Sequence, residues 1–284
     1  MDPATAVLTL QCADQPGIVA AVANLIADAG GNIANADQHT DRDSSVFLQR
    51  IEIDGGVDWD RFETMLAGVV AQFAMDWALH RPGVRERVVV ACSSELWCAA
   101  DLLNRVELGE LDIDVVALVS DRDKGAALAA RHDVPFIHVG GALSGGERAV
   151  QESAFAATLA ELAPDLVVLA RYMRILPETI TAAWTGRMIN IHHSFLPAFP
   201  GARPYHRAHQ RGVKLIGATA HYVTSELDAG PIIAQGVASV THRDEVEDMI
   251  RKGRDVERTT LAEAVRLHLE HRVLVWDNRT CVFA

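Results

Sequence analysis

Two short apolar runs, Leu166-Val167-Val168-Leu169 and Met188-Ile189-Asn190-Ile191, decide the fold class of this chain. Each has the length of a strand and carries almost no polar residue. Similar runs occur at residues 88–91, 115–119 and 136–139, and helical patterns alternate with them at residues 97–106, 125–132, 144–162 and 177–184. Buried strands that alternate with helices predict an α/β fold, with a Rossmann-like and mostly parallel sheet covered on both faces.

The flanking residues complete the domain plan. Two further strands follow at residues 217–223 and 231–240, then a long charged helix at 244–272 with a solvated or packing role, and a hairpin at 273–276 and 280–283. Before Arg81-Pro82-Gly83 the order changes to strand 6–10, helix 18–29, strands 32–40 and 45–53, helix 59–73 and strand 75–80. This order predicts a ferredoxin-like βαββαβ domain over residues 1–82 and a second domain over residues 83–284.

Composition excludes several classes of function. The 284 residues include 26 Lys and Arg against 38 Asp and Glu, a formal charge of −12, which disfavours a nucleic-acid partner. No apolar stretch reaches the roughly 20 residues of a membrane helix, and the N-terminal sequence is not typical of a signal peptide. Four cysteines lie far apart with no C-x-x-C pair, which favours free thiols and a cytoplasmic location, and matches no zinc pattern.

Polar residues gather where the strand at residues 188–191 ends. Asn190 and His192 are two apart on an extended chain, so their side chains point to the same side. An amide and an imidazole that converge there are able to stabilise an oxyanion. The alternative is that Asn190 caps a turn and His192 is an ordinary hydrogen-bonded core histidine.

A second polar segment follows. Thr219 and His221 share one side of the strand at residues 217–223, and Asp228 lies in a turn with Gly230 two positions on. Such an aspartate is most often a turn former, but beside an Asn/His pair it is able to orient water, accept its proton and tune His192. The loop after the first strand of this domain, residues 91–96, has no glycine fingerprint for a dinucleotide or a Walker A phosphate loop.

Four blocks of sequence resemble the folate-dependent formyltransferase family. They are Met173-Arg174-Ile175-Leu176, Asn190-Ile191-His192, Gly217-Ala218-Thr219-Ala220-His221 and Leu227-Asp228-Ala229-Gly230-Pro231-Ile232-Ile233. The resemblance implies that Asn190, His192 and Asp228 are catalytic. It implies that backbone groups of Arg174, Ile175 and Leu176, and of the loop leading into Asp228, hold the pterin. Thr219 and His221 match positions that support the catalytic aspartate at the substrate site.

The string His192-His193-Ser194-Phe195-Leu196-Pro197-Ala198-Phe199 and the residues after it are similar to the deformylase branch of that family. The transferase branches typically have Pro where this chain has His193. Their first loop is glycine-rich and holds a phosphorylated acceptor, whereas here Cys92-Ser93-Ser94-Glu95 places an acid there, which would repel a phosphate. The resemblance implies hydrolysis of 10-formyltetrahydrofolate to formate and tetrahydrofolate, with no cofactor and no metal. Such hydrolysis supplies formate for purine synthesis and balances the one-carbon folate pools.

Residues 12–19 and 30–33 look like an ACT domain, which the deformylase branch carries. This resemblance implies a homo-oligomer, a dimer or tetramer, and a small amino-acid effector such as glycine or methionine. The residues expected at the effector site are Asp14, Gln15, Gly17, Asn32 and Ile33, because the turn before the helix offers backbone N–H groups to a carboxylate. The alternative is a domain that only drives oligomerisation.

Two hypotheses from other classes remain open on the residues alone. One is a metal-dependent amidohydrolase that uses His192, His193, His206, His209 and Asp228, although His206 and His209 have the spacing of a helix surface. The other is a sensor that binds folate and an amino acid without catalysis. Asn190, His192 and Asp228 argue against the sensor.

Overall fold

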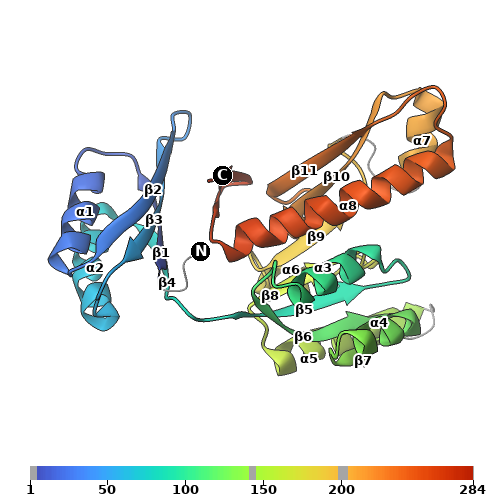
Figure 1. Cartoon of the computed structure of the whole chain (residues 1–284), viewed down its shortest axis with the longest axis horizontal. Coiled ribbons are helices and arrows are strands. Elements are labelled where there is room, and N and C mark those ends of the chain that lie inside the picture. The colour runs from blue at the N-terminus through green and yellow to red at the C-terminus, as the bar shows by residue number, and fades with distance from the viewer. Residues whose placement is uncertain (1–4, 141–144, 198–203, 284) are drawn as a thin grey trace. The chain divides into compact units, whose positions relative to one another are not determined.

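The structure is a computed structural model that describes residues 5–140, 145–197 and 204–283 (Figure 1). Ser144, the first residue of one predicted helix, and residues 198–203, which include part of the string quoted above, lie outside the described residues. Two compact units are present. One comprises residues 1–84, 268–276 and 280–284, and the other comprises residues 85–267 and 277–279. The last residues of the chain therefore group with the N-terminal unit, whereas the division expected at residue 82 assigns them to the second domain.

The N-terminal unit has the predicted βαββαβ order. Its elements are β1 (Ala6–Ala13), α1 (Ile18–Asp28), β2 (Asn32–Asp41), β3 (Val46–Asp54), α2 (Trp59–Phe73) and β4 (Asp76–His80). The strands form an antiparallel sheet in the order β2-β3-β1-β4. The ferredoxin-like prediction is confirmed.

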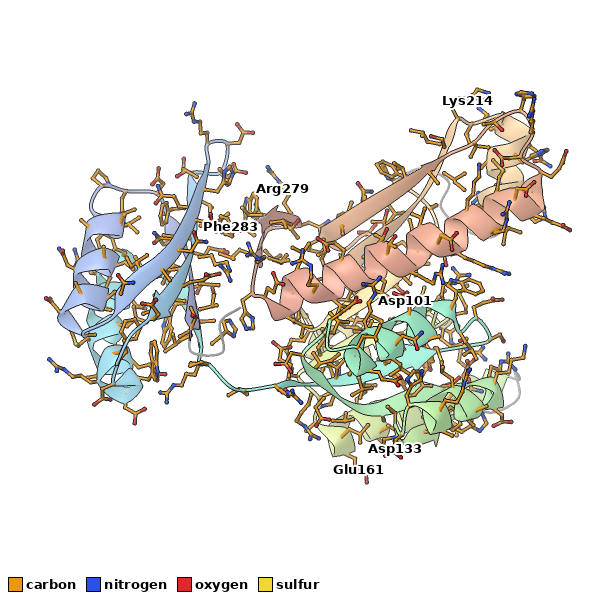
Figure 2. All side chains as sticks on the ribbon, in the orientation of Figure 1. Asp101, Asp133, Glu161, Lys214, Arg279 and Phe283 are labelled. Carbon is orange, nitrogen blue, oxygen red and sulfur yellow. The ribbon has the colours of Figure 1, made fainter. Side chains whose placement is uncertain are left out.

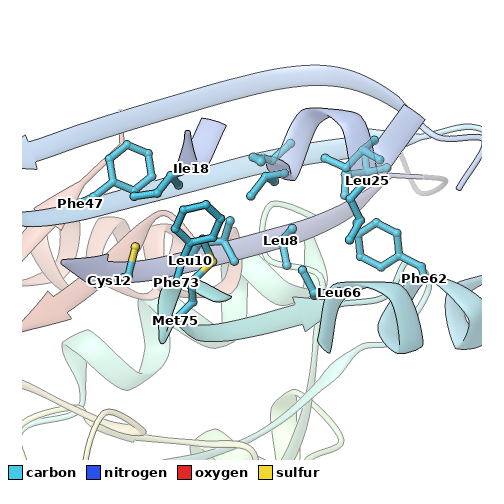
Figure 3. Close-up of a cluster of buried hydrophobic side chains, with 14 residues drawn as sticks. Leu8, Leu10, Cys12, Ile18, Leu25, Phe47, Phe62, Leu66, Phe73 and Met75 are labelled. Carbon is cyan, nitrogen blue, oxygen red and sulfur yellow. The ribbon is translucent and has the colours of Figure 1, made fainter. Parts of the chain in front are cut away.

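Alternation along β1 and β3 builds the core of this unit. Leu8, Leu10 and Cys12 of β1 and Phe47 of β3 point toward α1 and α2, and they join the buried aromatic and aliphatic residues of both helices (Figure 3). Helix α1 begins after Gly17, whose φ of 99° is a left-handed conformation that suits glycine, and no side chain caps its first turn.

The opposite face of β3 is covered by the end of the chain. Leu48 packs with Leu274 and Trp276 of β12 (Val273–Trp276) and with Phe283, which follows β13 (Arg279–Val282). Arg50 is fully buried, and its guanidinium donates to the carbonyls of Glu270 and His271 after α8 (Val246–Leu269). The predicted hairpin thus forms, and it completes the N-terminal unit.

The second unit contains a seven-stranded sheet in the order β11-β10-β9-β8-β5-β6-β7. Its strands are β5 (Glu86–Cys92), β6 (Ile113–Ser120), β7 (Phe136–His138), β8 (Leu166–Leu169), β9 (Met188–His192), β10 (Leu215–Tyr222) and β11 (Ile232–Ser239). The first five are parallel to one another, and β10 pairs antiparallel with both β9 and β11. The prediction of a mostly parallel sheet is confirmed.

Helices cover this sheet. They are α3 (Trp97–Glu107), η1 (Asp123–Gly125), α4 (Ala126–Arg131), α5 (Gly145–Leu162), α6 (Glu178–Ala183), α7 (Pro204–Arg211) and the long α8. Val89 and Ala91 of β5 pack with Phe155 and Leu159 of α5, and α3 and α8 lie in front of the sheet in Figure 1. Within the described ranges, no helix combines the length and the hydropathy that a membrane crossing requires.

Helix α8 is a packing helix despite its charges. Its buried residues recur every three or four positions as far as Thr260, as expected of a helix face, and are more closely spaced after it. They are Met249, Gly253, Glu257, Thr260, Leu261, Ala262, Ala264, Val265 and Leu267. Gly253 is required by close approach, because a side chain there would overlap the Tyr205 hydroxyl. Burial of an unpaired glutamate within an apolar stripe would lower the stability of the fold. Glu257 must therefore have polar partners on the elements that α8 contacts.

Glu86, at the start of β5, gives the fold a pH dependence that is testable. Burial, and next the charge of Asp165, raise the pKa of Glu86 from 4.5 to about 7. The folded state therefore keeps a proton that the unfolded state releases, and wild-type stability falls as the pH rises from 4.5 through 7. We expect Glu86→Gln to be more resistant to urea than wild type at pH 8, with little difference at pH 4.5.

The matched control is Glu161→Gln at an exposed position (Figure 2). Its unfolding midpoint should follow wild type at both pH values. A Glu86→Gln variant that behaves like this control would show that Glu86 is not held in its protonated form by the fold.

Candidate active site

A cavity of about 440 Å³ opens at the carboxyl ends of β8 and β9. Its volume is within the usual range for a small-molecule site. Three segments supply nearly all of its wall, the loop after β8, the end of β9, and the end of β10 with the turn that follows. The lining residues are Leu169, Arg171, Tyr172, Met173, Arg174, Ile175, Leu176, Thr181, Asn190, Ile191, His192, His193, His221, Val223, Thr224, Ser225, Glu226, Leu227 and Asp228.

Strand pairing brings the predicted polar residues together. β9 runs parallel to β8 and antiparallel to β10, so the sheet changes direction at this strand. In that register Asn190 lies directly opposite His221, and His192 lies opposite Thr219. The cross-strand pair of Asn190 and His221 places an amide and an imidazole side by side at the cavity wall.

The protonation of His221 follows from its contacts. Its Nδ1 is 2.9 Å from the carbonyl oxygen of Tyr222, which only accepts, so Nδ1 carries the hydrogen. Burial lowers the pKa of His221, so the ring is neutral at pH 7 and Nε2 is an acceptor. Asn190 Nδ2 donates to that Nε2 at 3.2 Å, and its second N–H remains available for an oxygen in the cavity.

His192 and Asp228 form the second pair. His192 Nδ1 lies 3.1 Å from Asp228 Oδ2, and the His192 side chain is only 7% exposed. The carboxylate holds the hydrogen on Nδ1 and stabilises positive charge on the ring. His192 Nε2 is buried and has no hydrogen-bond partner among residues 5–140, 145–197 and 204–283. Buried ring nitrogens are normally satisfied, so this one is the position at which a ligand would be bound.

The turn that carries Asp228 is held in an unusual conformation. Asp228 has a left-handed backbone with φ 54°, and Gly230 is needed because any side chain there would overlap the Tyr222 carbonyl. Burial raises the pKa of Asp228, but the hydrogen bond with His192 and the neighbouring histidines outweigh it, and the net pKa lies below the ordinary value. Asp228 is therefore a carboxylate at neutral pH.

The loop after β8 forms the other wall, as the resemblance predicts for residues 174–176. Arg174, Ile175 and Leu176 all line the cavity. The Arg174 guanidinium forms an ion pair with the buried Asp121 at 2.5 Å. Exposed apolar side chains of Met173 and Ile175 sit on the same wall, which suits a flat, partly apolar ligand.

Thr219 does not line the cavity, although it was predicted with the substrate-site residues. Its hydroxyl donates to the Ser194 carbonyl and accepts from Leu196 N–H, both at 3.0 Å, and Gln235 Nε2 also contacts it. The chain after β9 crosses over Thr219 and covers it. Thr219 shares a face with His221, as predicted, but it anchors the covering segment.

A second buried cluster lies beside the cavity, and the sequence did not reveal it. Glu257 of α8 is 1% exposed and accepts hydrogen bonds from Tyr205 Oη at 2.8 Å and Trp97 Nε1 at 3.0 Å. Arg171 lines the cavity with its guanidinium over the Trp97 ring, and its Nε is 3.5 Å from Glu257 Oε2. The signal available in the sequence was Glu257 itself, which falls in the apolar stripe of α8.

The loop after β5 supports this cluster from behind. Ser93 N–H donates to the Arg171 carbonyl, and the Ser93 hydroxyl accepts from Met173 N–H. Glu95 is not among the cavity-lining residues, so its expected repulsion of a phosphate would act from outside the wall.

The residues of the metal hypothesis are only partly brought together. His192, His193 and Asp228 line the cavity, but His206 and His209 lie on the exposed side of α7, where His209 is near Glu245. Among the residues that the structure describes, no group of three or more histidine, cysteine or acidic side chains is placed to hold a metal ion.

The expected effector residues occupy two places. Asp14, Gln15 and Gly17 lie before α1, and Asn32 and Ile33 begin β2 after it. Helix α1 has 11 residues, so about 16 Å of helix separates the two groups. All five residues are exposed, and they would form one site only across two copies of the chain.

Comparison with known proteins agrees with this division. Residues 86–265 match the family model described as Formyl transferase, and residues 6–58 match the ACT domain. The chain is 46% identical to a Synechocystis protein named formyltetrahydrofolate deformylase, and the similarity covers the full length of both chains.

Solved structures separate two groups. A formyltetrahydrofolate deformylase from Pseudomonas syringae matches with a TM-score of 0.95 and 44% identity, over 99% of this chain and 94% of that chain. A glycinamide ribonucleotide transformylase from Symbiobacterium toebii matches with a TM-score of 0.66 and 32% identity, over 72% of this chain and 97% of that one. Only the first likeness covers both units.

Thr219 supplies a test of the site's architecture. Thr219→Val keeps the shape but leaves the Leu196 N–H without its acceptor. We expect a loss of about 1–3 kcal/mol in the free energy of unfolding, the usual cost of a buried unpaired donor. Urea denaturation measures it, with Thr185→Val, at an exposed position just after α6, as control. Equal midpoints for the two variants would contradict the anchoring role.

Proposed function

The chain belongs to the formyltetrahydrofolate deformylase family, and from that premise we propose that it hydrolyses 10-formyltetrahydrofolate with Asp228, His192 and Asn190. The observation that carries the proposal is the pairing of His192 Nδ1 with Asp228, which leaves a buried Nε2 unpartnered among the described residues at the cavity wall. An Asp-oriented imidazole next to a free amide N–H has the composition of an oxyanion site with a proton carrier.

The folate is held between the two walls. Backbone groups of residues 174–176 and of the turn before Asp228 are placed to bind the polar edge of the pterin, and Met173 and Ile175 cover its apolar surface. This arrangement would bring the N10-formyl group toward the carboxyl end of β9, where Asn190 and His192 lie.

Hydrolysis then needs a balanced set of bond changes. The oxygen of water attacks the formyl carbon, a C–O bond forms, and Asp228 accepts a hydrogen bond from this water. One proton of the water passes to His192 Nε2, and the carbonyl oxygen becomes an oxyanion held by the second N–H of Asn190 Nδ2 and by the N–H that Nε2 then carries. The C–N10 bond breaks as N10 receives a proton through His192. The products are tetrahydrofolate and formic acid, which releases its proton to give formate.

The lowered pKa of Asp228 determines which role it has in the proposed hydrolysis. Its lowered pKa makes it a weak base, so its main contribution is to orient the water and to stabilise positive charge on His192. A carboxylate is required for both. Since its pKa is lowered, the ionised form persists below the usual range of a carboxyl group, and activity should be lost only when the pH falls through that lowered pKa.

Asp228→Asn tests the assignment. It keeps the size of the side chain, removes the charge, and should lower kcat for formate release about 10²- to 10⁴-fold, with a smaller change in KM. The measurement is formate production from 10-formyltetrahydrofolate with no amine acceptor present. A non-catalytic sensor would release no formate even as wild type, and a metal-dependent hydrolase would lose its activity on exhaustive chelation.

Asp133→Asn is the matched control. Asp133 has the same left-handed φ of 54°, is exposed (Figure 2), and is absent from the cavity wall. Wild-type turnover is expected for this variant. Near wild-type kcat in Asp228→Asn as well would remove Asp228 from the mechanism.

We also infer the role of the N-terminal unit from its ACT fold. A homo-oligomer, dimer or tetramer, would join the turn at Asp14, Gln15 and Gly17 of one copy to Asn32 and Ile33 of another, because one chain alone keeps them apart. Glycine and methionine lie at the ends of one-carbon metabolism, where formate and tetrahydrofolate are the products to regulate. The enzyme would act in the cytoplasm, in keeping with its four free cysteines, and would supply formate for purine synthesis.

Isothermal titration of the full-length protein with glycine and with methionine tests this inference. One of the two is expected to bind, and Asn32→Ala should weaken the binding at least tenfold if the site spans two copies. Asn35→Ala, on the same exposed strand, is the control. No heat with either amino acid would favour a domain that serves oligomerisation alone.

A further inference from the structure

His193 lines the cavity but has no part in the chemistry described so far. Its ring stacks on that of His192, with centroids 5.2 Å apart, and lies 6.5 Å from the ring of Tyr205. Neither ring nitrogen of His193 has a hydrogen-bond partner within the described part of the chain. A half-buried imidazole at the cavity wall, with neither nitrogen bonded to a described residue, is available to hold a small polar molecule.

The surroundings of His193 keep its ring neutral. Burial, and next the positive charge of Arg171, lower the pKa of His193 to about 3. The guanidinium of Arg171 is fixed by the Trp97 ring and by the carboxylate of Glu257, which Tyr205 also holds. The titratable or charged groups that face His193 come from three directions besides its own strand, and they are Arg171, His192, Asp228, Tyr205 and Arg207.

We propose that His193 positions the attacking water at the cavity wall, and that Arg171, held by Trp97 and Glu257, is a positioning residue beside it. This inference rests on the proposed hydrolysis. A neutral imidazole both donates and accepts, so one nitrogen of His193 accepts a hydrogen from the water, and Asp228 accepts the other. Two acceptors fix the water's lone pair toward the formyl carbon, which a single carboxylate does not do.

The proton balance of the reaction is unchanged. As the C–O bond forms, the water proton that is bonded to Asp228 passes to His192 and on to N10, and the proton that is bonded to His193 stays on the oxygen and leaves in formic acid. His193 takes no proton permanently. Because a charged His193 would only donate, it would turn the water's oxygen toward itself and away from the formyl carbon. The Arg171 guanidinium beside His193 therefore helps to keep the water in the orientation that the attack requires.

Removal of the ring is the first test. His193→Ala should lower kcat for formate release by 10-fold or more with KM changed less than threefold, because water is misplaced while the folate walls are intact. His193→Gln, whose amide also donates and accepts, should recover a substantial part of that loss. His209→Ala, on the exposed side of α7, should match wild type. Equal kcat for wild type and His193→Ala would overturn the proposal.

The pH profile of kcat is the second test, and a purely structural role would not move it. Arg171→Met removes the cation, so the pKa of His193 rises, and the acid limb of the profile should move to higher pH. The same change in a His193→Gln background should leave the limb in place, since glutamine does not titrate. Arg171→Lys keeps the charge, so the acid limb of its profile should stay in place even if its kcat falls. A shift that persists in the double variant would assign the effect to another group.

The two levels of inference fail in different ways. Wild-type protein that releases no formate from 10-formyltetrahydrofolate would overturn the proposed function. An active wild type with an equally active His193→Ala would leave that function standing and remove only the role of His193. If Arg171→Met does not fold because Glu257 loses its partner, the His193 variants still decide the question.

Discussion

The register of β9 between two unlike neighbours is the constraint on which the candidate site depends. β9 is parallel to β8 and antiparallel to β10, and it ends where both walls of the cavity meet. Side chains alternate along a strand, so a shift of one residue would replace Asn190 and His192 by their isoleucine neighbours. The buried Ile189 prevents that shift, because its exposure would cost apolar burial in the centre of the sheet.

Starting from this register, a chain of hydrogen bonds orients the polar side chains of the site one after another. The Tyr222 carbonyl, part of the strand backbone, sets the tautomer of His221, and His221 Nε2 then sets the orientation of the Asn190 amide. On the other side, a strained turn places Asp228, which fixes the hydrogen on His192 Nδ1. The groups that face the cavity are thus oriented before any ligand arrives, which is the condition for electrostatic stabilisation of a transition state.

The sequence predicts those features of the fold and the site that depend on residues close together in the chain, and not the contacts between residues far apart in it. Alternation within one strand was enough to place Asn190 and His192 on one side, and the composition of one turn was enough to single out Asp228 and Gly230. Pairing between strands was not readable, so the contact of Asn190 with His221 came only from the structure. Thr219 was assigned to the substrate site from the family resemblance, and nothing in its own strand indicates that the segment after β9 covers it. The Arg171–Glu257 cluster joins residues 86 positions apart, a separation that no local pattern reports.

The same reasoning explains how two adjacent histidines acquire different chemistry. His192 and His193 are neighbours in the chain, their rings stack, and both line the cavity. His192 meets the carboxylate of Asp228, which favours positive charge on its ring, whereas His193 meets the guanidinium of Arg171, which opposes it. In the proposed mechanism His192, beside a carboxylate, carries a proton, and His193, beside a guanidinium, is a neutral hydrogen-bond acceptor. In the proposed reaction, the charges placed around the cavity would therefore give two identical side chains different parts.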